Sequence, residues 1–177
     1  GVWSFGSIYV AFVLIPLLEF FLPGTDRNLS EAEEAQKLKN RFFDLLLYLN
    51  VPILYGLIFY YFQTLAAGGL ATYEIVGMTC NVGLVIGSCG INVGHELGHR
   101  ANAFERILAK LLLLPALYMH FIIEHNRGHH RNVATPADPA SARYGEMVYA
   151  FWLRSVAGGW VNAWKLERKR LNKKGEP

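Results

Sequence analysis

The sequence predicts an all-α fold: a polytopic membrane helical bundle whose histidine-box helices lie at the cytoplasmic side. Three observations lead to this prediction. First, 53% of the 177 residues are hydrophobic, and they form runs about as long as a bilayer is thick. Second, the loops between these runs differ in positive charge. Third, five of the six histidines fall in two short motifs, 95–99 and 125–130, whose four-residue spacing places side chains on one helix face.

The first three apolar runs are long enough to cross a bilayer, which takes about 20 apolar residues. We expect helices over about 2–22, 43–67 and 74–99. The third run carries glycines at helical spacing, and their small size favours close helix packing. Alternatively, the missing side chains would leave an apolar slot beside the histidines. These glycines are Gly83, Gly87, Gly90, Gly94 and Gly98.

The charges of two loops orient these spans. Ser30 and Glu33 form a capping box, which predicts a short solvated helix over about 31–41 in a loop with four positive residues. The next loop, 68–73, contains no Lys or Arg. Because positively charged loops stay in the cytoplasm, we expect residues 23–42 on that side. The third span then returns the first histidine motif to the same side.

The fourth apolar run, 107–123, is constrained by geometry. His125 follows His95 by 30 residues, and a straight helix of that length would cover roughly 45 Å. Metal ligands lie only about 2 Å from their metal. If the two motifs share a site, this run is not a plain span. We therefore predict a short re-entrant or interfacial helical hairpin that is broken near Pro115.

The C-terminal part is expected to lie at the membrane surface. Pro136 and Pro139 predict a loop over 131–146. Residues 146–164 are apolar and rich in tryptophan, which is typical of an interfacial helix. From Lys165 the chain becomes basic, which favours membrane lipid with anionic headgroups, although an acidic protein could also dock there. The formal net charge of +3 is too small to indicate a nucleic acid partner.

The first motif allows several interpretations. His95 and His99 lie one helical turn apart, so they could form a hydrogen-bonded structural pair or bind a metal such as zinc, copper or iron. Residues 95–99 also match HExxH, the zinc peptidase signature in which Glu96 would be the general base. A membrane zinc metallopeptidase is therefore one hypothesis. A non-enzymatic membrane module that binds metal or haem is another.

The second motif changes the balance between these hypotheses. His125, His129 and His130 add three imidazoles within six residues. Five clustered histidines are more than one tetrahedral zinc requires. The surplus favours two metals, or one metal with an all-histidine shell, and it suggests iron and oxygen chemistry. His120 lies outside both motifs and is expected to be structural.

These residues resemble a known family. The run His95-Glu96-Leu97-Gly98-His99-Arg100 looks like the first histidine box of the membrane-bound alkane 1-monooxygenases (alkane hydroxylases), which belong to the histidine-box desaturase and hydroxylase superfamily. The run Glu124-His125-Asn126-Arg127-Gly128-His129-His130 looks like their second box. Residues 133–146 are also similar to that family, and Asp-Pro-Ala-Ser-Ala-Arg at 138–143 is the more specific part. The resemblance covers essentially the whole chain.

The resemblance implies a non-haem di-iron enzyme that uses O₂ to hydroxylate the terminal methyl group of a medium- or long-chain alkane. It implies that rubredoxin delivers electrons from an NADH-dependent rubredoxin reductase. It also implies a multi-pass protein of the bacterial inner membrane with its active site on the cytoplasmic side. The ligands that it implies for two iron ions are His95, His99, His125, His129 and His130.

The family also has a third histidine box and an isolated histidine upstream of it, and this chain contains neither. We therefore expect 1–177 to be a single, incomplete transmembrane hydroxylase domain, a fragment of a longer protein that is inactive and poorly metallated alone. An alkane has no polar group, so its site should be a long apolar slot between helices. Some polar side chains are candidates to orient the ligand imidazoles through their free N–H groups. They are Asn92, Glu96, Glu124, Asp138 and Glu146.

Overall fold

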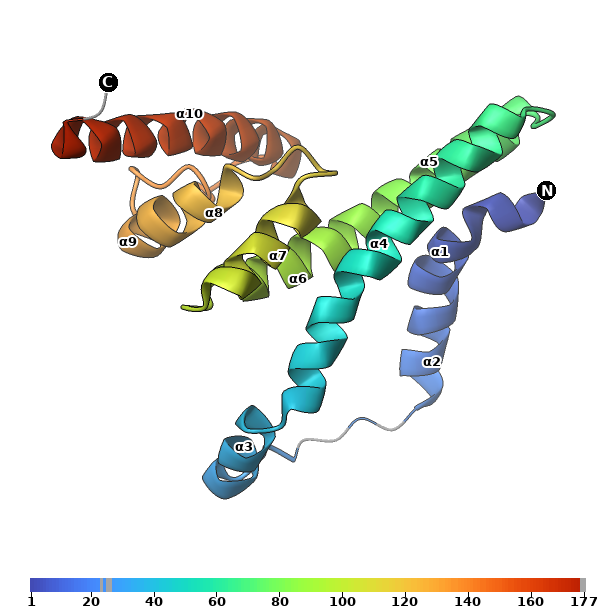
Figure 1. The fold of residues 1–177 in the computed structure, drawn as a ribbon, viewed down its shortest axis with the longest axis horizontal. Coiled ribbons are helices and arrows are strands. Elements are labelled where there is room, and N and C mark those ends of the chain that lie inside the picture. The colour runs from blue at the N-terminus through green and yellow to red at the C-terminus, as the bar shows by residue number, and fades with distance from the viewer. Residues whose placement is uncertain (23, 25–26, 176–177) are drawn as a thin grey trace. The chain divides into compact units, whose positions relative to one another are not determined.

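The computed structural model describes residues 1–22, 24 and 27–175, so the parts of the predictions that fall on 23, 25, 26, 176 and 177 lie outside the described residues. The chain forms two compact units, Gly1–Ala116 and Leu117–Pro177. Throughout the described residues the regular structure is helical, and no strand is present (Figure 1). The predicted all-α fold class is therefore confirmed.

The first unit begins with an apolar helical segment. Its pieces join into one candidate membrane span of 20 residues, Val2–Phe21, close to the predicted 2–22. Pro16 lies in the first turn of the last piece, where its missing N–H is tolerated. Ser7 contacts Asn81 through its backbone N–H and its hydroxyl, which joins this segment to α5 (Thr72–Val85). The pieces are η1 (Val2–Phe5), α1 (Gly6–Tyr9), η2 (Val10–Leu14) and α2 (Ile15–Phe21).

A short capped helix leads into the second span. The helix α3 (Glu31–Leu38) has the expected capping box, in which the Glu33 backbone N–H donates to Ser30 Oγ and the Ser30 backbone N–H donates to the Glu33 carboxylate. It ends earlier than the predicted 31–41. The helix α4 (Arg41–Ala67) follows, capped by the side chain of Asn40. It is a candidate span of 27 residues, as predicted for 43–67.

The third span returns alongside the second. It consists of α5, the π-helical turn η3 (Ile86–Ile91) and α6 (Asn92–Gly98), and these 27 residues form the third candidate span. Figure 1 shows α5 running back beside α4. A hydrogen bond of 2.8 Å between Tyr61 and Thr79 links the two helices. The three long apolar helices together confirm a helical membrane bundle.

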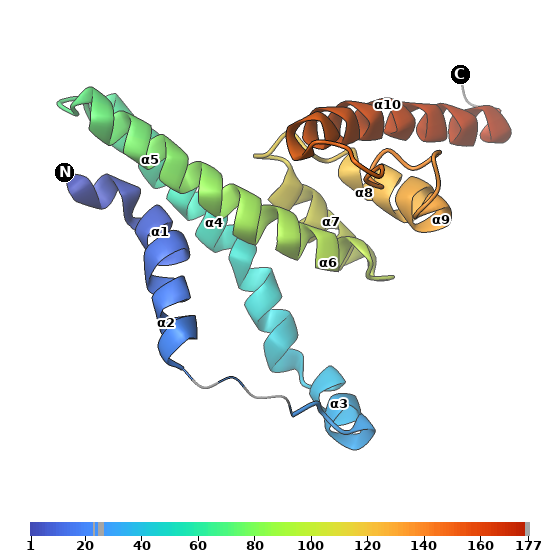
Figure 2. The ribbon, with the colours of Figure 1, turned by 180° about the vertical axis from the view of Figure 1, so that it is seen from behind.

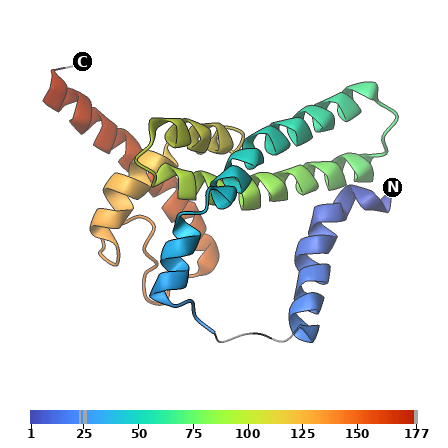
Figure 3. The same cartoon turned by 60° about the horizontal axis from the view of Figure 1, so that its bottom comes forward.

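The helix α7 (Ala103–Leu113) packs against α6 (Figure 3). Its Ala109, Leu112 and Leu113 are fully buried, as is Leu97 of α6. Eleven helical residues cover only about 16 Å, so α7 is too short to cross a bilayer. The break predicted near Pro115 is present, because α7 ends at Leu113 and a turn follows it. The helix begins earlier than the predicted residue 107.

Close packing explains part of the glycine series. A Cβ atom on Gly94 would lie 3.0 Å from Leu113 Cγ, and one on Gly90 would lie 3.1 Å from the Leu112 carbonyl oxygen. Both glycines therefore let α7 approach the third span. Gly83 and Gly87 have no such neighbours within 4 Å. Close packing thus accounts for Gly90 and Gly94, and the alternative interpretation, an apolar slot, stays open at Gly83.

The second unit places the second histidine box against a long helix. The elements α8 (Phe121–Glu124), η4 (His125–His129) and α9 (His130–Asn132) are followed by a loop and by α10 (Val148–Lys174). Figure 2 shows α8 lying along α10. The interfacial helix predicted over 146–164 was wrong in its extent. Its basic continuation is rich in Lys and Arg, which favour helix, so the helix ends only at Gly175, whose φ is +72°.

Candidate metal centre

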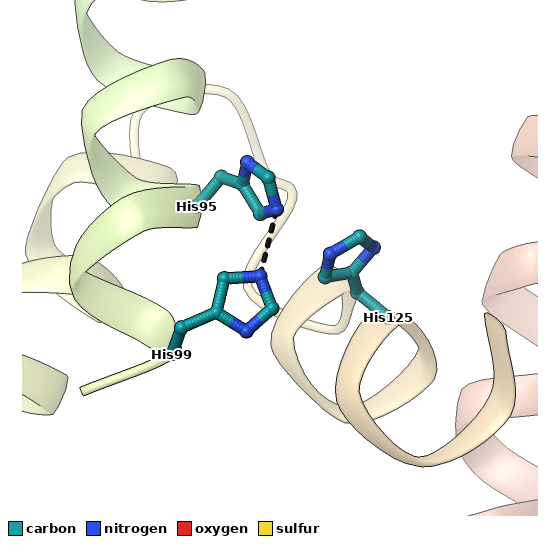
Figure 4. A group of neighbouring side chains, drawn as sticks. All are labelled: His95, His99 and His125. Carbon is teal, nitrogen blue, oxygen red and sulfur yellow. Dashed lines mark hydrogen bonds between the residues drawn. The ribbon is translucent and has the colours of Figure 1, made fainter. Parts of the chain in front are cut away.

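The first histidine box lies at the C-terminal end of the third span. His95 and His99 project from the same face of this helix, as Figure 4 shows, and their Nε2 atoms are 2.8 Å apart. The two ring centroids are 4.6 Å apart. Leu97, between them in sequence, is fully buried. The packing of α6 on α7 therefore fixes the face that carries the two imidazoles.

Charged side chains surround the first box. Arg100 donates to the Glu96 carboxylate from Nε at 3.2 Å and from Nη2 at 3.1 Å. Its Nη1 lies 3.4 Å from an Asp44 oxygen and 3.9 Å from an oxygen of the buried Glu105. The Tyr48 hydroxyl donates to Glu105. Arg100 therefore connects the start of α4 with α6 and α7. It also forms an ion pair with the carboxylate of Glu96.

The second box contains a π-helical turn that the sequence analysis missed. We expected His125 and His129 to share a face, and their rings are indeed stacked with centroids 5.3 Å apart. The π-turn His125–His129 also brings His130, five residues on, to His125, with their Nε2 atoms 3.0 Å apart. Phe121 stacks on His125. The side chain of His125 is drawn in Figure 4. Such turns occur often at functional sites.

Asp138 contacts a histidine of the second box directly. Its side chain is fully buried, and it lies 2.9 Å from Nδ1 of His129. Burial alone would raise the pKa of Asp138, but hydrogen bonds from Ser141, Ala140 and His129 lower it below its usual value. The ionised carboxylate can only accept a hydrogen bond, so Nδ1 of His129 carries the proton and donates it to this bond. This tautomer leaves Nε2 of His129 as the nitrogen that can bind a metal.

The other candidate polar residues have different partners. Glu124 is buried next to His125, it accepts from Asn162 at 3.1 Å, and burial raises its pKa. Glu146 forms an ion pair with Arg154 on α10. Asn92 is exposed at the start of α6. His120 packs edge-on against Tyr118, and burial lowers its pKa, in keeping with the structural role that we expected.

Sequence reasoning missed two residues of α10, Arg154 and Asn162, which hold acidic side chains beside the second box. A signal was present for Arg154. It is the only charged residue between Met147 and Trp164, and an arginine within an apolar run usually has a specific partner.

The histidine geometry fits a hydrogen bond between the two imidazoles of each pair, as Figure 4 draws for His95 and His99, and it also fits metal binding. Two nitrogens bound to one ion at about 2.1 Å and at a right angle lie about 3.0 Å apart. The Nε2 separations of 2.8 Å in the first box and 3.0 Å in the second are close to this value. Neutral imidazoles suit iron, zinc and copper. Within each unit the structure therefore brings together the histidines that the sequence predicts as ligands: His95 with His99, and His125 with His129 and His130.

Three candidate spans and two histidine clusters define a helical membrane protein with a candidate metal centre. Comparison with known proteins is consistent with this class. The family model described as fatty acid desaturase matches residues 71–176. The chain belongs to that family, and the match includes both histidine boxes.

Individual relatives are named more specifically. The chain is 41% identical to an alkane 1-monooxygenase of Pseudomonas putida, over 99% of this chain and 46% of that protein. It is 37% identical to alkane 1-monooxygenase 1 of Alcanivorax borkumensis, over 99% of this chain and 43% of that protein. These similarities confirm the resemblance to alkane 1-monooxygenases. The chain spans about half the length of the curated relatives that it matches.

A more distant relative is named for a different kind of substrate. The chain is 28% identical to the hydroxylase component of a xylene/toluene monooxygenase of Pseudomonas putida, over 80% of this chain and 39% of that protein.

Proposed function

We propose that this chain is the part of a non-haem di-iron alkane monooxygenase that carries the first two histidine boxes. The proposed reaction inserts one oxygen atom of O₂ into the terminal methyl group of a medium- or long-chain alkane. The observation that carries the proposal is the pairing of ligand nitrogens in each box, in a chain that is similar over nearly its whole length to alkane 1-monooxygenases.

In this proposal five histidines hold iron: His95, His99, His125, His129 and His130. Bound iron would supply the reduction of O₂ and the oxidant for C–H cleavage. The chain itself contributes orientation. Asp138 fixes the tautomer of His129, and Phe121 supports the ring of His125. The proposed number of two iron ions follows from the surplus of imidazoles over the needs of one metal.

The substrate site is proposed to be apolar and to lie between spans. The first unit has a cavity of about 320 Å³ whose lining is almost wholly apolar. A buried methylene group contributes roughly 0.8 kcal/mol, so a groove of this kind could bind a chain without polar contacts. The lining residues are Ile58, Tyr61, Phe62, Thr79, Val82, Gly83, Ile86 and Pro115.

We further propose that the protein lies in the bacterial inner membrane with the histidine boxes on the cytoplasmic side. The support is the charge of the loops. The loop that contains α3 is rich in Lys and Arg, whereas 68–73 contains neither. On this side rubredoxin, reduced by its NADH-dependent reductase, would deliver the electrons. The basic end of α10 would contact lipid headgroups.

The zinc peptidase hypothesis is less well supported. It needs Glu96 as a general base, but the Glu96 carboxylate accepts two hydrogen bonds from Arg100. It also gives no role to the second histidine box. The curated relatives reported above are all named as monooxygenases or a monooxygenase component.

The proposal is tested by supplying the full-length gene product, in membranes, with an alkane, NADH, rubredoxin, the reductase and ¹⁸O₂. We expect a primary alcohol that contains one ¹⁸O atom, detected by mass spectrometry. A reaction without rubredoxin is the control for other oxidases. Iron-loaded protein that forms no labelled alcohol from any alkane would contradict the proposed activity.

A further inference from the structure

We propose that Arg154 is a positioning residue for the second histidine box, because it holds the loop that aims Asp138 at His129. The inference rests on the proposed function to the extent that His129 is taken to bind metal. The three residues lie in the second unit, and the contacts between them form one continuous path.

The guanidinium of Arg154 binds three groups of the loop at once. Nε and Nη2 each donate to one oxygen of Glu146 at 2.6 Å. Nη1 donates to the carbonyl oxygen of Pro139 at 3.0 Å, and Nη2 donates to that of Ser141 at 2.9 Å. Four donor contacts from one planar group fix both the position and the orientation of the loop.

The contact with Arg154 keeps the carboxyl group of Glu146 ionised. Hydrogen bonds from the Arg154 side chain and the Arg143 backbone lower the pKa of Glu146 from 4.5 to about 2. The side chains of Glu146 and Arg154 are only 12% and 22% exposed. Solvent therefore competes less for this pair than for an ion pair on an open surface.

Ser141 carries the constraint to Asp138. Its carbonyl oxygen accepts from Arg154, and its hydroxyl donates to Asp138 Oδ2 at 2.5 Å. The backbone N–H of Ala140 donates to the other oxygen of Asp138 at 2.9 Å. Arg154 therefore binds the carbonyl of the Pro139–Ala140 peptide group, whose N–H donates to Asp138, and the carbonyl of Ser141, whose hydroxyl donates to Asp138. A shift of this segment would move the carboxylate that orients His129.

The helix α10 also contacts this segment directly, at Pro139. A Cβ atom on Gly158 would lie 2.7 Å from Cβ of Pro139, so the loop rests directly on the helix one turn after Arg154. The described residues 133–147, between α9 and α10, form no helix or strand. Ordering such a loop costs conformational entropy, and the hydrogen bonds of Arg154 offset part of that cost.

If Arg154 positions the loop that carries Asp138, its loss should make the second box retain metal less well. Residues that orient a ligating histidine typically change metal affinity by about 10- to 100-fold when they are replaced. A purely structural ion pair would change stability and leave the metal environment as it was. The two roles therefore differ in a measurement on the metal itself.

The test uses the full-length gene product, purified in detergent and loaded with ⁵⁷Fe(II) alone. The variants are Arg154→Ala, Arg154→Lys and Glu146→Gln. The control is Arg143→Ala, which removes an exposed positive charge from the same loop. The measurements are the rate at which a ferrous chelator removes iron and the Mössbauer spectrum of the bound iron.

We expect Arg154→Ala to lose iron at least about tenfold faster than the wild-type protein and to show a changed Mössbauer spectrum. We expect Arg154→Lys and Glu146→Gln to show intermediate changes, because each keeps part of the contacts, and Arg143→Ala to match the wild-type protein. If Arg154→Ala does not fold, Arg154→Lys and Glu146→Gln decide whether Arg154 positions the second box. Wild-type retention and an unchanged spectrum in the folded variants would overturn the inference.

The outcomes separate this inference from the proposed function. A wild-type protein that binds no iron would overturn both. A wild-type protein that binds iron but forms no alcohol would overturn the alkane monooxygenase activity, and the variants would still decide the role of Arg154.

Discussion

The buried carboxylate of Asp138 lies 2.9 Å from Nδ1 of His129, nine residues earlier in the chain. We expect Asp138→Asn to weaken this orientation, because the negative charge that holds the Nδ1 proton is lost. Iron affinity should fall about 10- to 100-fold. Competition with a ferrous chelator measures the change, with Glu31→Gln as an exposed control. Unchanged affinity in a folded Asp138→Asn protein would mean that His129 is not an orientation-sensitive ligand.

Gly128 lies in the π-turn of the second box, where a side chain would displace the Glu124 carboxylate and the Asn162 amide, which are hydrogen-bonded to each other. A Cβ atom would be 2.5 Å from Glu124 Oε1 and 2.7 Å from Asn162 Nδ2. We expect Gly128→Ala to destabilise the protein by about 1–3 kcal/mol. In the control Gly159→Ala, the new Cβ atom would meet only Glu124 Cγ at 3.9 Å, so this variant should gain up to about 1 kcal/mol. Unfolding followed by tryptophan fluorescence compares the two, and equal stability would contradict the packing described.

Glu146 should make the loop before α10 sensitive to acid. Its pKa in the folded protein is about 2 rather than 4.5, because of hydrogen bonds from Arg154 and then Arg143. A lowered pKa means that the stabilisation is complete above 4.5 and is lost as the pH falls towards 2. Glu146→Gln should remove this part of the pH dependence. Unfolding curves at several pH values in that range test it, and identical slopes for both proteins would refute it.

Glu96 distinguishes the oxygenase from the peptidase. Its carboxylate is exposed and pairs with Arg100, so its loss should cost about 0–1 kcal/mol of stability. We expect Glu96→Ala to keep its iron and part of its alkane hydroxylation, because Glu96 is not proposed as a ligand. A protein that keeps zinc but loses all turnover would instead indicate a general base. Metal analysis and alcohol formation are measured on the same sample.

Gly83 tests the apolar groove of the first unit. It lines the groove and has open space beside it, so Gly83→Leu should fold and fill part of the cavity. If alkanes bind there, the rate should fall more for long alkanes than for short ones. Gly87→Leu is the matched control, because Gly87 also has open space but does not line the groove. Equal profiles for the two variants, measured by gas chromatography, would exclude this groove as the substrate site.

The features that the sequence predicted well have local causes. Ser30 and Glu33 satisfy each other's backbone groups within one turn, and apolar runs long enough for a bilayer require helices. The break near Pro115 was also local, since proline lacks an N–H. Gly175 ends α10, and the basic run before it is helical as well, because Lys and Arg have high helix propensity.

The features that escaped prediction depend on one local irregularity of the backbone and on tertiary contacts. His130 reaches His125 because a π-turn adds one residue to the turn, and ordinary helical spacing predicts no such pair. Arg154 and Asn162 act on residues at least eight positions away. Glu146 meets Arg154 because the loop folds onto α10, and Glu124 meets Asn162 because α8 packs on α10. The histidine clusters and the candidate Asp138 could therefore be predicted from the sequence, whereas Arg154 and Asn162, which hold acidic side chains in place, could not.

The histidine boxes are proposed to serve a di-iron centre. The most direct measurement is the metal content of the full-length gene product, purified anaerobically in detergent and analysed by mass spectrometry. Our account predicts close to two iron ions per chain and little zinc. One zinc ion and no iron would contradict it and would favour the peptidase.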